Sequence, residues 1–419
     1  MFKNKIKIYN YLTILISIFP ILGLKKSVFT IIIWALFSIF IVFSEKTYKR
    51  IYKKDGINLL VLTSYYFAFV ISFFFIDDRA LASRFLEKNI AFLLFPLFMI
   101  VNKDFIFPDT LKKALYGFIF SNLILASYIW IIILSKGYSE TMAADNYYNP
   151  TIRNIFSDVS EIHLPYLGIL FVFSSLILLK DILFSENKFS LLNGARLLAI
   201  SLLVFSVVAF AARLALFSFL LVSLFLIFKI TKTSGIRIMF VLGFFLLLLA
   251  IFMVPSSKKR IDDVLNTELI LPNKNQNSSE VNFRYGIYHC ASTILKENWI
   301  TGVGPGNVQK QLDDCYSSYT YKNYDDYSHI EYNSHNQYID ICLKFGIFGL
   351  IGFLIFIFWG VNTKDLIYHV FLFIILIGLI TENLFDRQIG VVFFTFFNSL
   401  FFINKTHYFE KSISSRLAR

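Results

Sequence analysis

Long apolar runs separated by short polar connections make up most of the chain. These runs show neither the 3.6-residue period of an amphipathic helix nor the alternation of a half-buried strand. A hydrocarbon layer about 30 Å thick needs roughly 20 apolar residues per helix, and a backbone in lipid has to satisfy its own hydrogen bonds. The pattern therefore predicts an all-α polytopic membrane protein with about twelve transmembrane helices, at residues 8–24, 27–44, 58–76, 88–101, 113–135, 162–184, 197–212, 214–228, 237–254, 337–360, 366–381 and 388–404.

The composition agrees with a single membrane domain over residues 1–419. Hydrophobic residues make up 57% of the chain, aromatic residues 18% and charged residues only 16%. Soluble domains are about half apolar and about a quarter charged. We therefore expect no soluble domain, and the sequence shows no internal repeat and no low-complexity linker.

The positions of the basic residues account for the net charge of +12. Lysine and arginine cluster in the connections at 46–54, 103–113 and 229–237, and again in the tail at 405–419. By the positive-inside rule these connections face the cytoplasm, as do both termini, and the first apolar run is an uncleaved anchor. The excess of basic residues therefore indicates how the chain is oriented in a lipid bilayer, and it does not indicate a nucleic-acid partner.

This orientation puts two long polar segments outside, at about 136–160 and 256–336. Cys290 and Cys315 share the second segment, where a disulfide is permitted, and the sequence leaves their pairing open. Cys342 is expected to be buried in a helix.

Arg213 interrupts an apolar block that runs from Leu197 to Phe228. As one helix the block would be roughly 48 Å long, which is too long for a single crossing. Split at Arg213, it predicts two short helices whose tip lies at or slightly below the outer membrane face. An arginine there is either a snorkelling anchor or an anion clamp in a watery cavity. We favour the clamp, because the guanidinium fork suits phosphate oxygens.

The outer segment 256–336 is long for a connection without function. Its middle predicts a helix that begins near Phe283 and ends near Asn298. Arg284 and Tyr288, four residues apart, would lie on one face of that helix.

A glycine-rich stretch, Gly302-Val303-Gly304-Pro305-Gly306, follows this helix. It fits a tight turn, or a backbone that approaches a phosphate. Beyond it, tyrosines crowd between Tyr316 and Tyr332 together with carboxylates. They form either an interfacial aromatic belt or a surface on which sugar rings stack.

His335 stands with Asn333, Ser334 and Asn336 where the outer segment re-enters the membrane. A histidine can take a proton from an acceptor hydroxyl near neutral pH. The alternative is a histidine that caps the helix or binds the neighbouring amides. The six histidines form no pair or Cys/His cluster with ligand spacing, so we expect neither a metal site nor a cofactor.

Several of these motifs together resemble the bacterial O-antigen ligase and polymerase superfamily. The resemblance rests on "FRYGIYHCASTILKENWITGVGPGN" and on "NSHNQYIDICLKFGIFGLIGF", where Gly346, Gly349 and Gly352 carry the glycine spacing. "AFAARLALFSFLL" is similar to the family's inter-helix arginine segment. "EIHLPYLGILFVF" is similar to its His-Pro-Tyr helix start, but Leu164 separates the histidine from the proline.

The resemblance implies a metal-independent glycosyltransferase whose donor is a glycan linked to undecaprenyl pyrophosphate. It implies that Arg213 and Arg284 bind the pyrophosphate and that His335 assists the acceptor hydroxyl. Two arginines can neutralise charge that grows on a departing pyrophosphate. We expect His163, Gly304, Asn336 and Tyr332 to bind substrate.

The acceptor distinguishes the two main hypotheses. An O-antigen ligase transfers the finished glycan to lipid A–core, whereas a polymerase of O-antigen, capsule or exopolysaccharide units transfers it to a growing glycan. Transfer to protein and a non-enzymatic transporter are further alternatives. A transporter should carry ionisable groups near the bilayer midplane, but here the polar groups gather at the outer face. We therefore expect a multi-pass enzyme of the bacterial inner membrane with its active site outside.

Overall fold

The computed structural model describes residues 2–136, 150–231, 268–272, 280–319, 332–361 and 365–417, with scattered positions between 235 and 245. Every regular element in this part of the chain is a helix. Seven of the described helices are long and apolar enough to cross a membrane, and two shorter apolar helices lie at 366–381 and 388–404. The all-helical fold is confirmed, whereas the count of twelve spans is not. Most of the expected span 237–254 and most of the tyrosine-rich stretch lie outside the described residues.

The chain begins with a helical hairpin, α1 (Phe2–Ile16) and α2 (Phe19–Glu45). Lys5 Nζ lies 2.7 Å from Glu45 Oε1 at the open end of the hairpin. Trp34 donates a hydrogen bond of 2.9 Å to Thr13 Oγ1 in its middle. At the closed end Gly23 has φ +68°, which divides α2 into a short first turn and a long second helix. The connection η1 (Thr47–Arg50) leads to α3 (Lys53–Phe73).

The expected span at 88–101 is wrong as a single crossing. The chain instead forms α4 (Arg79–Asn89) and α5 (Ala91–Val101), each of 11 residues. A helix of that length is roughly 16 Å long, about half of the hydrocarbon thickness. The apolar run is explained by burial inside the protein, because Phe92, Phe95 and Met99 are fully buried between neighbouring helices.

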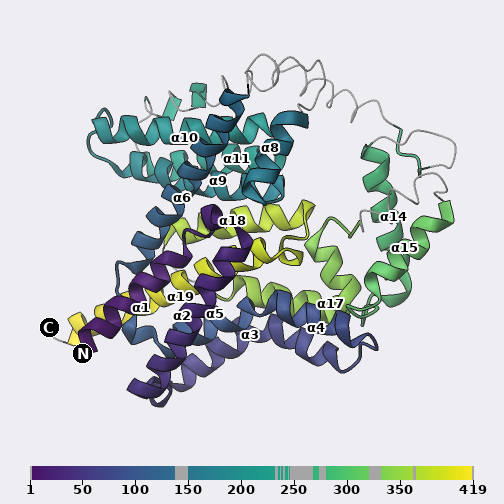
Figure 1. Ribbon diagram of the computed structural model, residues 1–419, viewed down its shortest axis with the longest axis horizontal. Coiled ribbons are helices and arrows are strands. Elements are labelled where there is room, and N and C mark those ends of the chain that lie inside the picture. The colour runs from purple at the N-terminus through teal and green to yellow at the C-terminus, as the bar shows by residue number, and fades with distance from the viewer. Residues whose placement is uncertain are drawn as a thin grey trace.

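A second group of helices follows η2 (Lys103–Phe105). It consists of α6 (Thr110–Ser135), α8 (Pro150–Ser160), α9 (Leu164–Phe184), α10 (Leu191–Ala209) and α11 (Arg213–Ile230). The expected break before Arg213 is confirmed, since α10 ends at Ala209 and α11 begins at Arg213. Figure 1 shows α8 to α11 packed together as one layer.

Two helices of the outer segment form a small unit of their own. These are α14 (Glu280–Asn298), which ends where the sequence predicts, and α15 (Val308–Tyr319). Cys290 and Cys315 form a disulfide between them. Ile287 and Leu312 are buried in their common core. In Figure 1 this pair lies at the end of the molecule opposite both chain termini.

The last group is α17 (Gln337–Phe358), α18 (Leu366–Thr381), η3 (Leu384–Asp386) and α19 (Gln388–Leu417). Gly346 interrupts α17 with φ +66°. Cys342 lies in α17 as expected but is only partly buried. Buried phenylalanines, among them Phe371, Phe385 and Phe394, join α18, η3 and α19 through ring contacts.

Candidate functional site

His335 lies in a tight turn immediately before α17. Asn336 is the N-cap of this helix, and its side-chain oxygen accepts hydrogen bonds from the backbone of Tyr338 and Ile339 at 3.0 and 3.1 Å. Asn333 Oδ1 accepts a hydrogen bond of 3.0 Å from the His335 backbone. His335 itself has φ +45°, a conformation that is uncommon for residues other than glycine and that occurs preferentially at functional sites. The two amides therefore hold the backbone that presents the imidazole.

Buried polar groups join this turn to the segment between α18 and α19. Ser334 Oγ and the Asn383 side chain lie within hydrogen-bond distance, at 3.3 Å. Gln337 Oε1 accepts a hydrogen bond of 2.8 Å from the Phe385 backbone. Because Ser334, Gln337 and Asn383 are all nearly inaccessible to solvent, these bonds fix the two segments against each other.

An ion cluster lies beneath these bonds. Lys344 Nζ is 2.5 Å from Asp340 Oδ2 and 3.0 Å from Asp386 Oδ1. Lys88 of α4 reaches the same Asp386 oxygen at 3.4 Å. Breaking a buried pair by removing one partner is costly, so the cluster keeps the 382–387 segment in place below His335.

Glu382, which the sequence analysis did not single out, faces His335. Its Oε2 atom lies 3.9 Å from His335 Nδ1, and its side chain is only 12% exposed. The Nδ1 atom is buried and makes no hydrogen bond to the described residues. A carboxylate in this position can stabilise an imidazolium that forms when the other ring nitrogen takes a proton.

His163, the N-cap residue of α9, lies in the same electrostatic neighbourhood. The charges that act on it are those of Glu382, Arg387, His335 and Arg153. One turn further, the Tyr166 hydroxyl donates a hydrogen bond of 2.9 Å to the backbone carbonyl of Asn383. This bond connects the start of α9 to the segment that carries Glu382.

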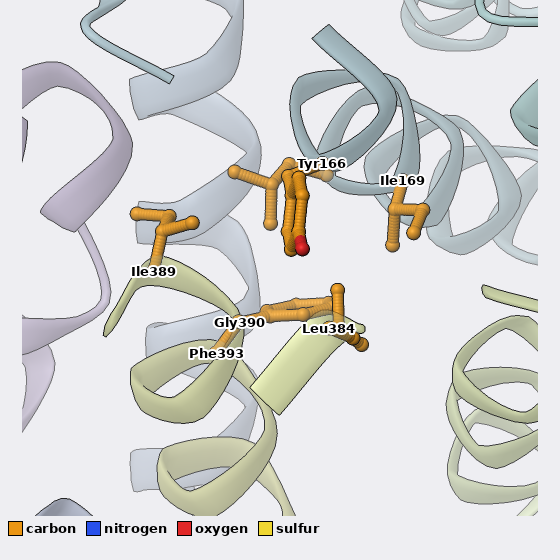
Figure 2. A pocket seen from close by; sticks show the side chains of 7 residues that line it. Tyr166, Ile169, Leu384, Ile389, Gly390 and Phe393 are labelled. Carbon is orange, nitrogen blue, oxygen red and sulfur yellow. The ribbon is translucent and has the colours of Figure 1, made fainter. Parts of the chain in front are cut away.

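The same junction is closed by apolar contacts. Figure 2 shows Tyr166 and Ile169 of α9 facing Leu384, Ile389 and Phe393 across a small apolar pocket. The accessible surface of the pocket is apolar, and the Tyr166 hydroxyl beside it already donates to Asn383, so the pocket offers a substrate no free polar group.

Tyr332 links His335 to the α14–α15 unit. Its ring lies 5.7 Å from the His335 ring and 4.8 Å from the ring of Phe283, centroid to centroid. Its backbone carbonyl accepts a hydrogen bond from the Tyr316 hydroxyl at 3.3 Å.

Arg284 is exposed and follows Phe283 in the chain. Burial raises the pKa of the nearby Tyr288 hydroxyl; the charge of Arg284 opposes this shift and that of Glu382 adds to it. Arg284 and Glu382 therefore both act electrostatically on Tyr288, which brings α14 near the segment that carries Glu382.

Arg213 is presented by the turn between α10 and α11. Ala211 has φ +56°, and Arg153 of α8 donates a hydrogen bond to the backbone carbonyl of Phe210. A side chain on Gly168 of α9 would clash with Ala212 and Ala215, at 2.8 Å each, so the turn packs directly on α9. Arg213 is exposed at the same end of this layer as His163.

Gly304 has a different environment. It has φ +82°, and nothing lies within 4 Å of the position where a Cβ would stand. Its neighbour Val303 donates a backbone hydrogen bond of 2.7 Å to Leu343, eight residues beyond His335 and roughly 12 Å along α17. The contacts of Gly304 show a turn residue, and a role in substrate binding stays a prediction.

The structure thus brings Tyr332 against His335 and places His163 within electrostatic reach of it, with Arg284 and Arg213 on neighbouring elements. It adds Glu382, Arg387 and Arg153, which sequence reasoning missed. The charges in "TENLFDRQ", between two apolar runs, were the available signal for the first two. In the part of the chain that the structure describes, no group of three or more His, Cys, Asp or Glu side chains is arranged to hold a metal ion.

Comparison with known families identifies the region that carries half of these residues. A family model described as O-antigen ligase matches residues 197–354, which include Arg213, Arg284 and His335. No curated protein matches the chain. Residues 197–354 are thus similar to an O-antigen ligase domain, and this match supports the assignment of the chain to the O-antigen ligase and polymerase superfamily.

Proposed function

We propose that the chain transfers a glycan from undecaprenyl pyrophosphate to a sugar hydroxyl, outside the cytoplasmic membrane, and that it acts as an O-antigen ligase on lipid A–core. The observation that carries the proposal is the pairing of His335 with Glu382 next to His163, on which Arg387 and Arg153 act electrostatically. This arrangement combines a proton acceptor with groups that bind an anion.

The charges around the site suit a pyrophosphate. Arg387 and Arg153 act electrostatically on His163, Arg284 borders Tyr288, and Arg213 begins α11 on the same layer. The Glu382 carboxylate acts on both His163 and Tyr288. Guanidinium groups bind phosphate oxygens through paired hydrogen bonds, and such preorganised charges stabilise a leaving group in the transition state.

The chemical step is a displacement at the anomeric carbon. The acceptor oxygen forms the new bond to this carbon as its proton passes to His335. The bond to the pyrophosphate oxygen breaks, and undecaprenyl pyrophosphate leaves with the electron pair. Glu382 stabilises the imidazolium, while Arg213 and Arg284 stabilise the departing pyrophosphate. Attack opposite the leaving group inverts the anomeric carbon.

The acceptor is tested by the surface-glycan profile of cells that lack the gene. A ligase predicts lipid A–core without any attached glycan, together with long glycans that accumulate on the lipid carrier. A polymerase predicts a core that carries a single repeat unit. Complementation with His335→Ala should reproduce the deletion profile in either case.

The reaction itself is tested with purified protein, lipid-linked donor and acceptor. Arg213→Ala, Arg284→Ala and His335→Ala should each abolish transfer while the protein still inserts into membranes. Wild-type rates in both the Arg284→Ala and the His335→Ala variant would overturn the mechanism.

A further inference from the structure

A polar cavity, distinct from the apolar pocket described above, lies beside the candidate site at the closed end of the α1–α2 hairpin. Its volume is about 220 Å³. It is lined by the turn that contains Gly23, by Lys25 and Lys26 at the start of the long part of α2, by Leu125 of α6, and by Ser160 and Glu161 between α8 and α9. None of these residues has a role in the proposed transfer reaction.

Two residues with a left-handed backbone conformation shape this cavity. Gly23 has φ +68° and Glu161 has φ +54°. A Cβ on Gly23 would lie 3.5 Å from Glu161 Oε2, so the two turns face each other closely. Because Gly23 breaks α2, a new helix starts at Lys25, and its first backbone N–H groups have no partner within the helix.

The charged residues that line the cavity favour an anionic ligand, and one negative wall residue can also accept a positive group attached to that ligand. Lys25 and Lys26 are both exposed and contribute two positive charges beside the positive end of the helix. Glu161 contributes one negative charge. The Ser160 hydroxyl is already used, since it donates to the Phe156 carbonyl and accepts from the Ile162 backbone.

The face of α2 that continues from the lysines is apolar and exposed. Phe29 is 64% exposed, and Leu36 is 62% exposed. In a chain that crosses a membrane, such a face contacts acyl chains, and lysines at its end lie at the level of the head groups. The cavity therefore opens where a lipid head group meets the protein.

We propose that this cavity binds the phosphate group of a membrane lipid, with Lys25 and Lys26 as its ligands and the acyl chains along the exposed face of α2. The size of the cavity fits this ligand. At about 30 Å³ per water molecule, 220 Å³ corresponds to roughly seven waters. This is room for a phosphate with its nearest substituents, and the rest of the lipid would lie outside the cavity.

The site is separate from the transfer chemistry but close to it. Glu161 lies two residues before His163, so a lipid held here borders the start of α9. The ligand chemistry is shared by two sources: bulk phospholipids of the membrane, and a phosphorylated lipid acceptor. The proposal does not depend on which reaction the chain catalyses.

Native mass spectrometry of the purified full-length protein tests the proposal with three probes: phosphatidylglycerol, phosphatidylethanolamine and the phosphate-free diacylglycerol. The wild type should retain the first two and release the third. Lys25→Ala/Lys26→Ala should lower the retained phospholipid by about tenfold, which corresponds to about 1.4 kcal/mol. Lys3→Ala/Lys7→Ala, which removes two exposed lysines from α1, is the matched control and should retain lipid as the wild type does.

Further variants separate the possible outcomes. Glu161→Gln should weaken phosphatidylethanolamine relative to phosphatidylglycerol, because the glutamate can pair with the ammonium group. With phosphorylated lipid A added as a fourth probe, retention of lipid A alone would identify the acceptor as the source of the phosphate. Equal retention of diacylglycerol, or unchanged retention in the double-lysine variant, would overturn the proposal. His335→Ala should retain lipid as the wild type does. Lipid retention therefore tests this site even if the proposed transfer reaction is wrong.

Discussion

The Glu382 carboxylate lies 3.9 Å from Nδ1 of His335, although the two residues are 47 positions apart in the chain. His335 precedes α17, whereas Glu382 follows α18. The contact is slightly longer than a hydrogen bond, and catalytic hydrogen bonds are often long before substrate binds. The pair is held by the Ser334–Asn383 contact and by the Lys344–Asp386 ion pair, not by direct bonding between its two members.

The first prediction concerns this pair. Glu382→Gln keeps the shape of the side chain but removes the charge that stabilises the imidazolium. We expect kcat to fall by at least about tenfold with little change in KM, whereas loss of the base in His335→Ala costs about 10²–10⁴-fold. Steady-state transfer rates with purified protein measure both.

A double mutant separates coupling from independent effects. If Glu382 acts through His335, then Glu382→Gln/His335→Ala should be no slower than His335→Ala alone. Glu297→Gln, an exposed carboxylate on α14, is the control and should leave the rate unchanged. Additive losses in the double mutant would show that Glu382 does not act through the histidine.

The second prediction concerns Arg153, a positioning residue for the α10–α11 turn. Arg153→Ala removes the hydrogen bond to the Phe210 carbonyl, and a bond from a charged donor contributes about 1.5–3 kcal/mol. We expect a lower Tm and a loss of about tenfold or more in kcat/KM, because the turn then presents Arg213 less accurately.

Two further variants check this interpretation. Arg153→Lys should recover part of the rate, because it restores a charged donor. Arg196→Ala removes a hydrogen bond within the same layer, to Asn193, and should lower Tm without lowering the transfer rate. A normal transfer rate in Arg153→Ala despite a lowered Tm would show that Arg153 contributes to stability and not to the positioning of Arg213.

Patterns local in sequence predicted much of the fold. The apolar block from Leu197 to Phe228, which contains Arg213, is too long for one crossing, and the structure places the break at that residue. The helix from Glu280 to Asn298 ends where the sequence predicts and buries Ile287 and Ile294. These features depend on neighbours three to seven residues apart, which a single sequence displays.

The site was only half predictable, because its other half depends on contacts between distant segments. Glu382 and Arg387 belong to a short connection whose composition resembles that of any interhelical loop. Their role appears only when Tyr166 and Ser334 bind Asn383 from two other elements. The span at 88–101 was mispredicted for a related reason, since composition cannot distinguish an apolar helix in lipid from one buried in protein.

The third prediction concerns the close approach of two backbones. Gly302 and Gly346 both have positive φ, and the Ile347 backbone donates a hydrogen bond of 2.8 Å to the Trp299 carbonyl. A Cβ on Gly346 would lie 2.0 Å from the Ile300 carbonyl oxygen, so Gly346→Ala cannot fit without moving α14 away from α17. We expect a clear fall in Tm and in transfer rate, since overpacking costs about 1–3 kcal/mol before the strain of positive φ is added.

Gly352→Ala provides the matched control in the same helix. Nothing lies within 4 Å of its Cβ position, and alanine favours a helix over glycine by about 1 kcal/mol. Its Tm should therefore be equal to or above that of the wild type. Equal Tm values for the Gly346 and Gly352 variants would contradict the packing described between α14 and α17.

The last prediction joins the disulfide to the orientation of the chain. The Cys290–Cys315 bond closes a separation of 25 residues and ties α14 to α15, which together carry Arg284 and contact Tyr332. A disulfide of this span stabilises by about 2–4 kcal/mol, so Cys290→Ala/Cys315→Ala should lower Tm and weaken donor binding, whereas Cys342→Ala should do neither. In cells denatured without reductant, the two cysteines should resist a thiol-reactive polymer until reductant is added, because disulfides persist only in oxidising compartments. Immediate modification of both in the denatured, unreduced cells would show free thiols, as expected of a cytoplasmic α14–α15 unit, and would remove the basis for transfer outside the membrane.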